Sequence, residues 1–109
     1  MWSPLRITSD LLRSQVTDFA LQLTRPAVKD LDALAEKVRS DILESMLLLR
    51  GDPFPMGPTK KKLRGFKFPL YRLRVGDHRL LYRIDERTVT VLRIIDRKEL
   101  KRVVRRLMQ

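Results

Sequence analysis

The sequence predicts a single α+β domain in which helices pack against an antiparallel sheet. The length of 109 residues supports one domain with one hydrophobic core. Apolar residues recur every three or four positions in the first half of the chain and alternate with polar residues in the second half. A stretch rich in proline and glycine, residues 51–59, separates the two patterns. The expected order is β-α-α-β-β-β-α, preceded by an N-terminal extension at residues 1–16.

The first half is expected to contribute one strand and a long helical segment. Residues 18–23 alternate loosely and predict a strand. Thr24 is a suitable N-cap, with Pro26 in the first helical turn, where its missing N–H costs nothing. Apolar residues then recur at helical spacing through residues 28–47, which predicts one amphipathic helix or two helices that divide near residues 35–37.

The second half is expected to form three strands and a basic helix. The strands are predicted at residues 70–75, 78–84 and 88–95, with turns at 76–77 and 85–87. Asp96 can cap a final helix that runs from Arg97 to about Leu107. We expect the apolar stripe of this helix to pack on the sheet of the same chain; it consists of Leu100, Val103, Val104 and Leu107.

The composition excludes several classes of function. The chain has no cysteine and one histidine, so thiolate zinc sites, cysteine nucleophiles and two-histidine ribonuclease sites are excluded, and we expect no metal and no cofactor. No apolar run approaches the roughly 20 residues of a membrane span, and no secretory signal is visible, so we expect a cytoplasmic protein. Asp30 and Asp32 are expected to be solvated charges on a helix rather than catalytic carboxylates.

The net charge of +11 is concentrated in the second half of the chain. Residues 60–109 hold 17 of the 24 basic side chains but only 5 of the 13 acidic ones. Such asymmetry predicts a polyanionic partner, because each lysine or arginine that meets a phosphate releases counterions. A charge that serves only solubility is the alternative.

Arginines alternate with apolar residues along the first strand of the second half. This spacing places Leu70, Arg72 and Arg74 on one face, and the apolar residues between them must face the helices. Strand pairing can bring Arg79 and Arg83 to the same face, where guanidinium groups can grip phosphate oxygens. Further RNA contacts are expected from the preceding loop and the last helix: Lys60, Lys61, Lys62, Arg64, Lys67, Arg97 and Lys98. The same pattern could instead keep an open sheet face solvated.

Four short sequence motifs, in this order, resemble the RelE/ParE toxin superfamily, and in particular its RelE-like branch. They are Lys62-Leu63-Arg64-Gly65, Tyr71-Arg72-Leu73-Arg74, Asp77-His78-Arg79-Leu80-Leu81-Tyr82 and Asp96-Arg97-Lys98-Glu99. The resemblance covers roughly residues 18–105 and implies one toxin domain at residues 17–109. It further implies a toxin of a type II toxin–antitoxin pair that cleaves mRNA in the ribosomal decoding site. The implied partners are a cognate antitoxin, the ribosome and mRNA.

The resemblance also implies roles for individual residues. Arg72 and Arg74 occupy the positions of two catalytic lysines, and Arg79 that of the arginine on the scissile phosphate. Arg97 or Lys98 corresponds to a basic residue that acts as an acid on the leaving group. The implied reaction is attack of a ribose 2′-OH on the adjacent phosphate, which yields a 2′,3′-cyclic phosphate and a 5′-OH.

The chain departs from the family pattern in ways that affect this chemistry. Arginine is a poorer base than lysine, so Arg72 and Arg74 are better suited to clamp phosphate than to accept a proton. The candidates for a base are His78, Lys98 or the ribosomal RNA; His78 could equally be a hydrogen-bonded turn residue. The terminal tyrosine of one branch has no counterpart, since Val103 and Val104 occupy that region.

These departures keep two other functions open. One is a ParE-like toxin that inhibits DNA gyrase, and the other is a non-catalytic protein that binds RNA. Toxicity on expression would separate the second from both toxins, and blocked translation rather than blocked replication would separate the two toxins.

Overall fold

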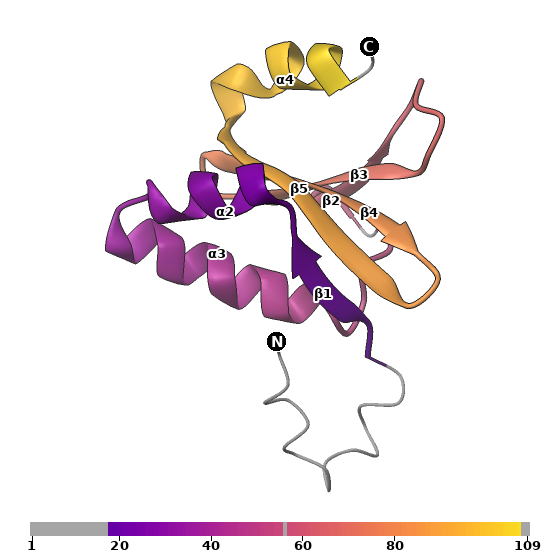
Figure 1. The fold of residues 1–109 in the computed structure, drawn as a ribbon, viewed down its shortest axis with the longest axis horizontal. Helices are drawn as coiled ribbons and strands as arrows, with labels where there is room; N and C mark the ends of the chain where they lie inside the picture. Colours follow the sequence, from indigo (N-terminus) through magenta and orange to yellow (C-terminus); the bar gives the residue numbers. More distant parts are fainter. Residues whose placement is uncertain (1–17, 56, 108–109) are drawn as a thin grey trace, which may run out of the picture.

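The computed structural model describes residues 18–55 and 57–107, which form a five-stranded sheet with helices on both faces (Figure 1). The elements in chain order are β1 (Ala20–Leu23), α2 (Arg25–Asp32), α3 (Glu36–Leu49), β2 (Lys60–Leu63), β3 (Leu70–Val75), β4 (His78–Asp85), β5 (Thr88–Asp96), the 3-10 turn η2 (Arg97–Glu99) and α4 (Leu100–Leu107). The predicted α+β class is confirmed. The extension expected at residues 1–16 lies outside the described residues.

The sheet is mixed rather than purely antiparallel. Its strand order is β1-β5-β4-β3-β2, and only β1 pairs in parallel, with Ala20 opposite Thr88 of β5. The predicted antiparallel sheet is confirmed for β2 to β5, and this edge adds one parallel pairing that the sequence did not indicate. Two helices and three strands separate β1 from its partner, so no hairpin dictates its direction.

A fourth strand precedes the predicted three. Residues 60–63, which the sequence pattern placed in a loop, form β2 and pair antiparallel with β3. Three consecutive lysines show no alternation, so the pattern could not predict a strand. Lysines suit this position because β2 is an edge strand, and charged side chains there oppose pairing with other chains.

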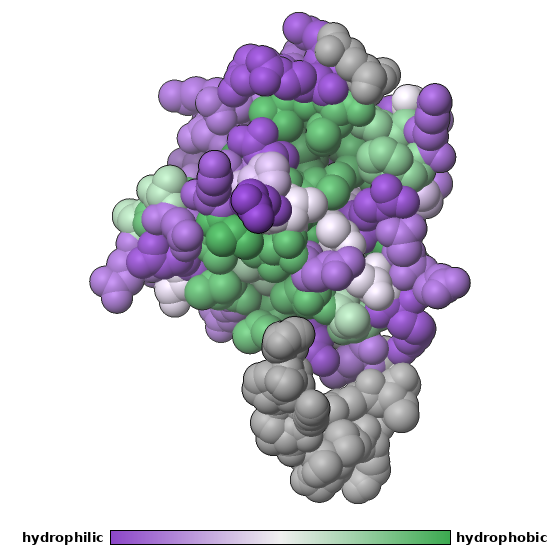
Figure 2. Space-filling view, viewed as in Figure 1, coloured by the Kyte–Doolittle hydropathy of each residue, from purple (hydrophilic) through white to green (hydrophobic). Residues whose placement is uncertain are grey.

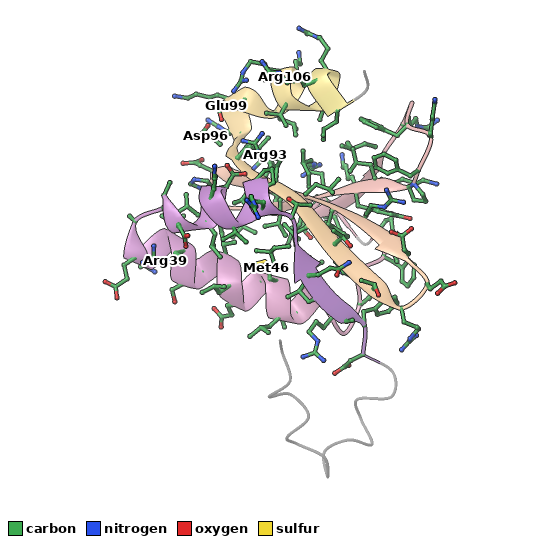
Figure 3. All side chains as sticks on the ribbon, viewed as in Figure 1. Arg39, Met46, Arg93, Asp96, Glu99 and Arg106 are labelled. Carbon is green, nitrogen blue, oxygen red and sulfur yellow. The ribbon has the colours of Figure 1, made fainter. Side chains whose placement is uncertain are left out.

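The helical segment of the first half consists of two helices, α2 and α3, which confirms the second of the two alternatives predicted for it. The Thr24 hydroxyl accepts a hydrogen bond from the Ala27 N–H (3.2 Å), which confirms the predicted cap. Ile42 and Met46 of α3 are buried in the same core as Tyr82 of β4. Figure 3 shows Met46 on the side of α3 that faces the sheet. The Tyr82 hydroxyl donates a hydrogen bond of 2.7 Å to the carbonyl of Pro53, so the loop after α3 is attached to the core.

The opposite face of the sheet is covered at one end by α4. The Asp96 carboxylate accepts a hydrogen bond from the Lys98 N–H (2.8 Å), as the predicted cap requires, but the chain first makes the turn η2 before α4 begins. Val103 is buried against Leu70, Leu81 and Ile95. The stripe on this helix therefore packs on the chain's own sheet, as predicted, and Figure 2 shows apolar surface beneath the polar outer side of α4.

Candidate functional site

Three arginines lie on one face of the β3–β4 hairpin, here called the arginine face. Residues directly opposite each other in a ladder share a face, and Arg74 lies opposite Arg79. Arg72, two positions earlier on β3, points to the same side because side chains alternate along a strand. The intervening Tyr71 and Leu73 are buried in the core that includes α2 and α3. The arginines therefore share a face, as the alternation predicted.

Arg79 is held by the turn that joins β3 to β4. Its Nη1 donates hydrogen bonds to the carbonyl oxygens of Gly76 (3.0 Å) and His78 (2.9 Å). Gly76 has a φ of 61°, a left-handed conformation that favours glycine, so the tight turn depends on this residue type. Among the described residues, Nε and Nη2 of Arg79 have no hydrogen-bond partner. That edge of the guanidinium is available to an anion.

The positive charges on this face repel one another. Burial lowers the pKa of Arg79, and the charges of Arg72, Arg74 and Arg97 lower this pKa further. Asp77 acts in the opposite direction. Burial also lowers the pKa of Arg72, and the charge of Arg74 lowers the same pKa by a smaller amount. An anion bound among these groups would relieve the repulsion, because an opposite charge stabilises each protonated guanidinium.

Arg97 belongs to this cluster through its backbone as well as its charge. Its N–H donates to the Asp77 carbonyl at 2.9 Å, which ties the start of η2 to the β3–β4 turn. Its Nε lies 3.9 Å from Oδ1 of Asp77 in an exposed ion pair. Lys98 is exposed, and its backbone N–H donates a hydrogen bond to the Asp96 carboxylate. Of the two candidates, Arg97 is the one that acts electrostatically on Arg79.

His78 lies apart from the arginine face. It is opposite Val75, whose side chain packs toward the helices, and it lines a small cavity with Val38 and Asp41 of α3. Adjacent residues of a strand point to opposite faces, so His78 and Arg79 are separated by the sheet. The structure therefore does not support the hypothesis that His78 is the base, and the alternation alone contained this signal.

The lysines of β2 are divided between the two faces of the sheet. Lys61 lies opposite Arg72 and shares the arginine face. Lys60 and Lys62 lie opposite residues that face the helices, and Lys60 Nζ donates a 2.7 Å hydrogen bond to the carbonyl of Asp52. The expectation that all three lysines approach the arginines from a loop is corrected, because they belong to a strand and alternate.

Comparison with protein-family models identifies the ParE toxin of the type II toxin–antitoxin system parDE, which matches residues 21–101. The chain belongs to this toxin family. It is thus a type II toxin of the RelE/ParE superfamily. Comparison with characterised protein sequences gave no match.

Solved structures with this fold come from both branches of the superfamily. The archaeal RelE–RelB complex from Pyrococcus horikoshii is 26% identical, with a TM-score of 0.64, and the match covers 73% of this chain and 96% of that one. The toxin–antitoxin complex RelBE2 from Mycobacterium tuberculosis is 29% identical, with a TM-score of 0.61, covering 72% and 98%. The ParDE system from P. aeruginosa shares the fold at 21% identity, with a TM-score of 0.59, covering 73% and 97%. These similarities do not decide between the RelE branch, which the sequence motifs predicted, and the ParE branch.

Arg83 of the toxin lies on the arginine face but is already paired. It is opposite Leu70, and its Nε and Nη2 donate to both carboxylate oxygens of Asp85 (2.8 and 3.1 Å). Its guanidinium also lies 4.3 Å from the ring centroid of Phe68. Since a bidentate carboxylate occupies this fork, Arg83 is less available to phosphate than Arg79 is.

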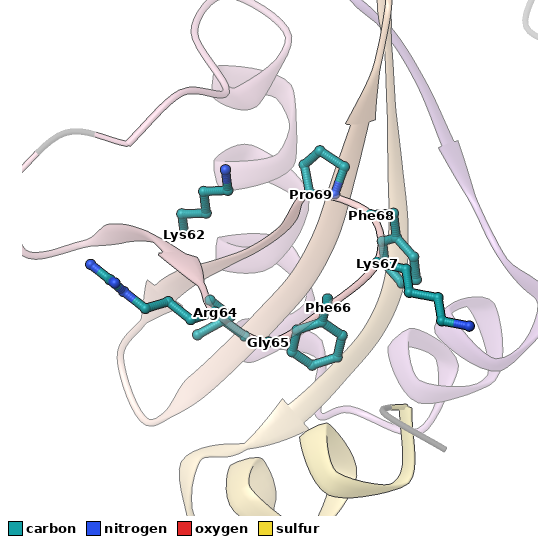
Figure 4. Close-up of a pocket in the computed structure, with 8 residues that line it drawn as sticks. Lys62, Arg64, Gly65, Phe66, Lys67, Phe68 and Pro69 are labelled. Atoms are coloured by element: carbon teal, nitrogen blue, oxygen red, sulfur yellow. The ribbon is translucent and has the colours of Figure 1, made fainter.

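The remaining basic candidates of the toxin surround a cavity that sequence reasoning did not predict. Residues 62–69 line a concavity of about 550 Å³, to which Arg64 and Lys67 contribute (Figure 4). Its apolar walls include Phe66 and Phe68. The sequence does contain a sign of this cavity, because Phe66 and Phe68 flank Lys67 in a basic segment. The position of the two rings, however, depends on the path of the loop.

Asp30 of the toxin is an anchor rather than a solvated charge. Its Oδ2 accepts hydrogen bonds from Nε of Arg93 (2.6 Å) and from the Ile94 N–H (2.9 Å), and Oδ1 accepts from Nη2 of Arg93 (3.1 Å). Figure 3 shows Arg93 beside α2. The hydrogen bond to Asp30 raises the pKa of Arg93. This contact spans 63 positions of sequence, so no local pattern could reveal it.

No helix in the described part of the toxin is long and apolar enough to cross a membrane. The same residues contain no group of three or more side chains able to hold a metal ion.

Proposed function

We propose that the toxin is a ribosome-dependent endoribonuclease that cleaves mRNA in the decoding site and so inhibits translation. The observation that carries this proposal is that Arg72 and Arg74 share a face with Arg79, and that the charges of Arg72, Arg74 and Arg97 act together on Arg79, where the charge of Asp77 opposes them. Such an arrangement suits a phosphodiester that gains negative charge as its phosphorus becomes five-coordinate.

In the proposed reaction, the ribose 2′-OH attacks the adjacent phosphorus, and the bond to the 5′-oxygen of the next nucleotide breaks. Arg79 contacts the scissile phosphate through Nε and Nη2, while Arg72 and Arg74 bind the charge that develops on its oxygens. The guanidinium groups remain protonated at neutral pH, so they orient and stabilise rather than remove a proton. With His78 behind the sheet, the proton of the 2′-OH goes to Lys98 or to a group of the ribosomal RNA. The leaving 5′-oxygen takes up a proton in turn, from Lys98 or from water, and becomes the 5′-OH.

A cell-free translation reaction with primer extension on the reporter mRNA tests the proposal. The toxin should create discrete 5′ ends only when ribosomes are present, and Arg79→Ala should reduce their formation by roughly 100-fold or more. Arg25→Ala is a matched control, because it removes an exposed arginine from α2, on the other side of the sheet. The affinity of Arg79→Ala for ribosomes should stay within a few-fold of the wild-type value. Loss of both cleavage and ribosome binding in this variant would contradict the role assigned to Arg79.

Inhibition of DNA gyrase is a second candidate, favoured by the match to the ParE family. Intact mRNA and normal protein synthesis, together with inhibited supercoiling by purified gyrase, would establish it in place of the nuclease. Ribosome binding that leaves both mRNA and supercoiling unaffected would instead indicate a non-catalytic protein.

A cognate antitoxin is the proposed regulatory partner. Similar structures from Pyrococcus horikoshii and Mycobacterium tuberculosis are toxin–antitoxin complexes. An acidic segment laid across the arginine face would neutralise its charge and block access to RNA.

A further inference from the structure

The loop between β2 and β3 borders an open surface cavity. Residues 62–69 line about 550 Å³, and the charged residues among them are all cationic: Lys62, Arg64 and Lys67 (Figure 4). Gly65 has a φ of 89°, a conformation that residues with a Cβ rarely adopt, and this bend lets the loop fold back on itself. The cavity thus depends on a glycine and carries positive charge around its rim.

Two phenylalanines supply the apolar part of this lining. The ring centroids of Phe66 and Phe68 lie 6.0 Å apart with an interplanar angle of 49°. Both rings pack against the buried cluster under α4, which holds them in place, and both remain half-exposed. Arg83 lies over the Phe68 ring, so part of that ring is already in contact with a cation. Phe66 is the ring without such a cation above it among the described residues.

The cavity continues the arginine face along the sheet. Leu63, which lines it, lies opposite Leu70, and Leu70 shares its face with Arg72 and Arg74. Arg74 lies four positions after Leu70, a distance of about 13 Å along a strand. A single polynucleotide strand bound at the arginines can therefore reach the loop.

We propose that this cavity is a subsite for one nucleobase of single-stranded RNA, which stacks on Phe66 while Arg64 and Lys67 contact the adjacent phosphates. Aromatic rings combined with a positively charged groove are the features with which proteins bind single strands, since every base has a face that can stack. The proposal rests on the proposed function and extends it to a neighbouring nucleotide of the same substrate. An acidic protein segment would match the charges but would leave the ring faces without a stacking partner.

Binding of short RNA by the isolated toxin provides the test. The probe is a fluorescent single-stranded oligonucleotide with 2′-O-methyl groups, which cannot undergo attack by the 2′-OH, and a set of the same oligonucleotides each with one abasic position. Fluorescence anisotropy should show that one abasic position weakens binding roughly ten-fold. Phe66→Leu should weaken the intact probe by a similar factor and become insensitive to that abasic position.

Two further variants keep this result interpretable. Phe66→Trp retains a stacking surface and should retain affinity and the abasic effect, which excludes a loss through misfolding alone. Phe54→Leu removes an exposed ring outside the cavity and should behave as the wild type. The proposal would be overturned if Phe66→Leu bound the intact probe as tightly as the wild type. It would also be overturned if the abasic position weakened binding to Phe66→Leu as much as it weakens binding to the wild type.

The outcome is separable from that of the proposed function. If the wild type cleaves mRNA on ribosomes but shows no coupling between Phe66 and a base, only the cavity assignment fails. If Phe66→Leu binds RNA normally but loses affinity for the antitoxin, the cavity belongs to a protein partner and the assignment is overturned. If coupling is present but mRNA stays intact, the base subsite stands and the nuclease proposal fails.

Discussion

The two faces of the β3–β4 hairpin are made by alternating residues of the same strands but have opposite properties. Toward α2 and α3, Tyr71 and Tyr82 stack with ring centroids 5.5 Å apart, and Tyr82 is fully buried. On the arginine face, Arg74 is exposed and Arg79 is half-buried. One side of the hairpin therefore maintains the fold, while the other presents charge to solvent. Substitutions on the two sides should separate stability from activity.

The arginine face is itself divided along its length. Near the loop, Leu70 and Leu81 are buried under α4, whereas near the β3–β4 turn the arginines are left uncovered. The position of α4, rather than the strands alone, thus decides which residues of these two strands can meet a ligand.

The largest expected loss of stability comes from Tyr82→Ala. This change removes a fully buried ring and its hydrogen bond to Pro53, and should lower the free energy of unfolding by about 3–5 kcal/mol. Urea denaturation measures the effect. Arg79→Ala should change the same free energy by no more than about 1 kcal/mol, because the loss of its two hydrogen bonds is offset by relief of the repulsion from the neighbouring arginines. Similar losses for both variants would contradict the division between the faces.

Asp30→Ala tests the attachment of the helices to the sheet. Loss of the hydrogen bonds to Arg93 and Ile94 should lower the free energy of unfolding by about 2 kcal/mol. Asp32→Ala removes an exposed carboxylate two positions later in the chain and should lower the free energy of unfolding by less than about 0.5 kcal/mol. Equal effects of the two variants in thermal or urea unfolding would return Asp30 to the role of a solvated charge.

Alkaline pH should weaken the helix-facing side specifically. Burial raises the pKa of Tyr82, with smaller contributions from Tyr71 and Asp52. Above about pH 10 the unfolded chain loses this proton while the folded protein keeps it, so stability falls as the pH rises. Melting temperatures between pH 8 and pH 11 should decline less steeply for Tyr82→Phe than for the wild type. Parallel pH profiles would show that another group is responsible.

The smallest expected effect is that of His78→Gln on cleavage. Removal of a general base lowers the rate of cleavage roughly 100-fold or more. Because His78 lies on the opposite face of the sheet from the arginines, its substitution should lower this rate far less. Primer extension under single-turnover conditions would measure it. A loss as large as that of Arg79→Ala would require His78 to reach the reacting phosphate.

Alternation was the most informative sequence pattern for both fold and site. It placed Arg72, Arg74 and Arg79 on one face because the other face had to be apolar, and packing against α2 and α3 enforces that choice. The same rule separates His78 from Arg79. The caps at Thr24 and Asp96 were also predictable, because a cap is a local hydrogen bond.

The features that escaped prediction depend on contacts distant in sequence. The strand β2 forms because β3 offers it a partner, not because its lysines favour a strand. The ion pair of Asp30 with Arg93 and the parallel pairing of β1 each join segments more than 60 positions apart. The cavity beside Phe66 requires both the bend at Gly65 and the packing beneath α4.

The parallel pairing of β1 with β5 has a consequence for the order in which the toxin is built. β1 leaves the ribosome first among the described strands, but its partner, which begins at Thr88, is synthesised last. The hairpins of the second half can close as soon as they emerge, since their contacts are local. The helix α2, whose Asp30 bonds Arg93 and Ile94 of β5, gains this attachment only after β5 has been synthesised. The first strand of the described toxin therefore waits for the last one before the sheet is complete.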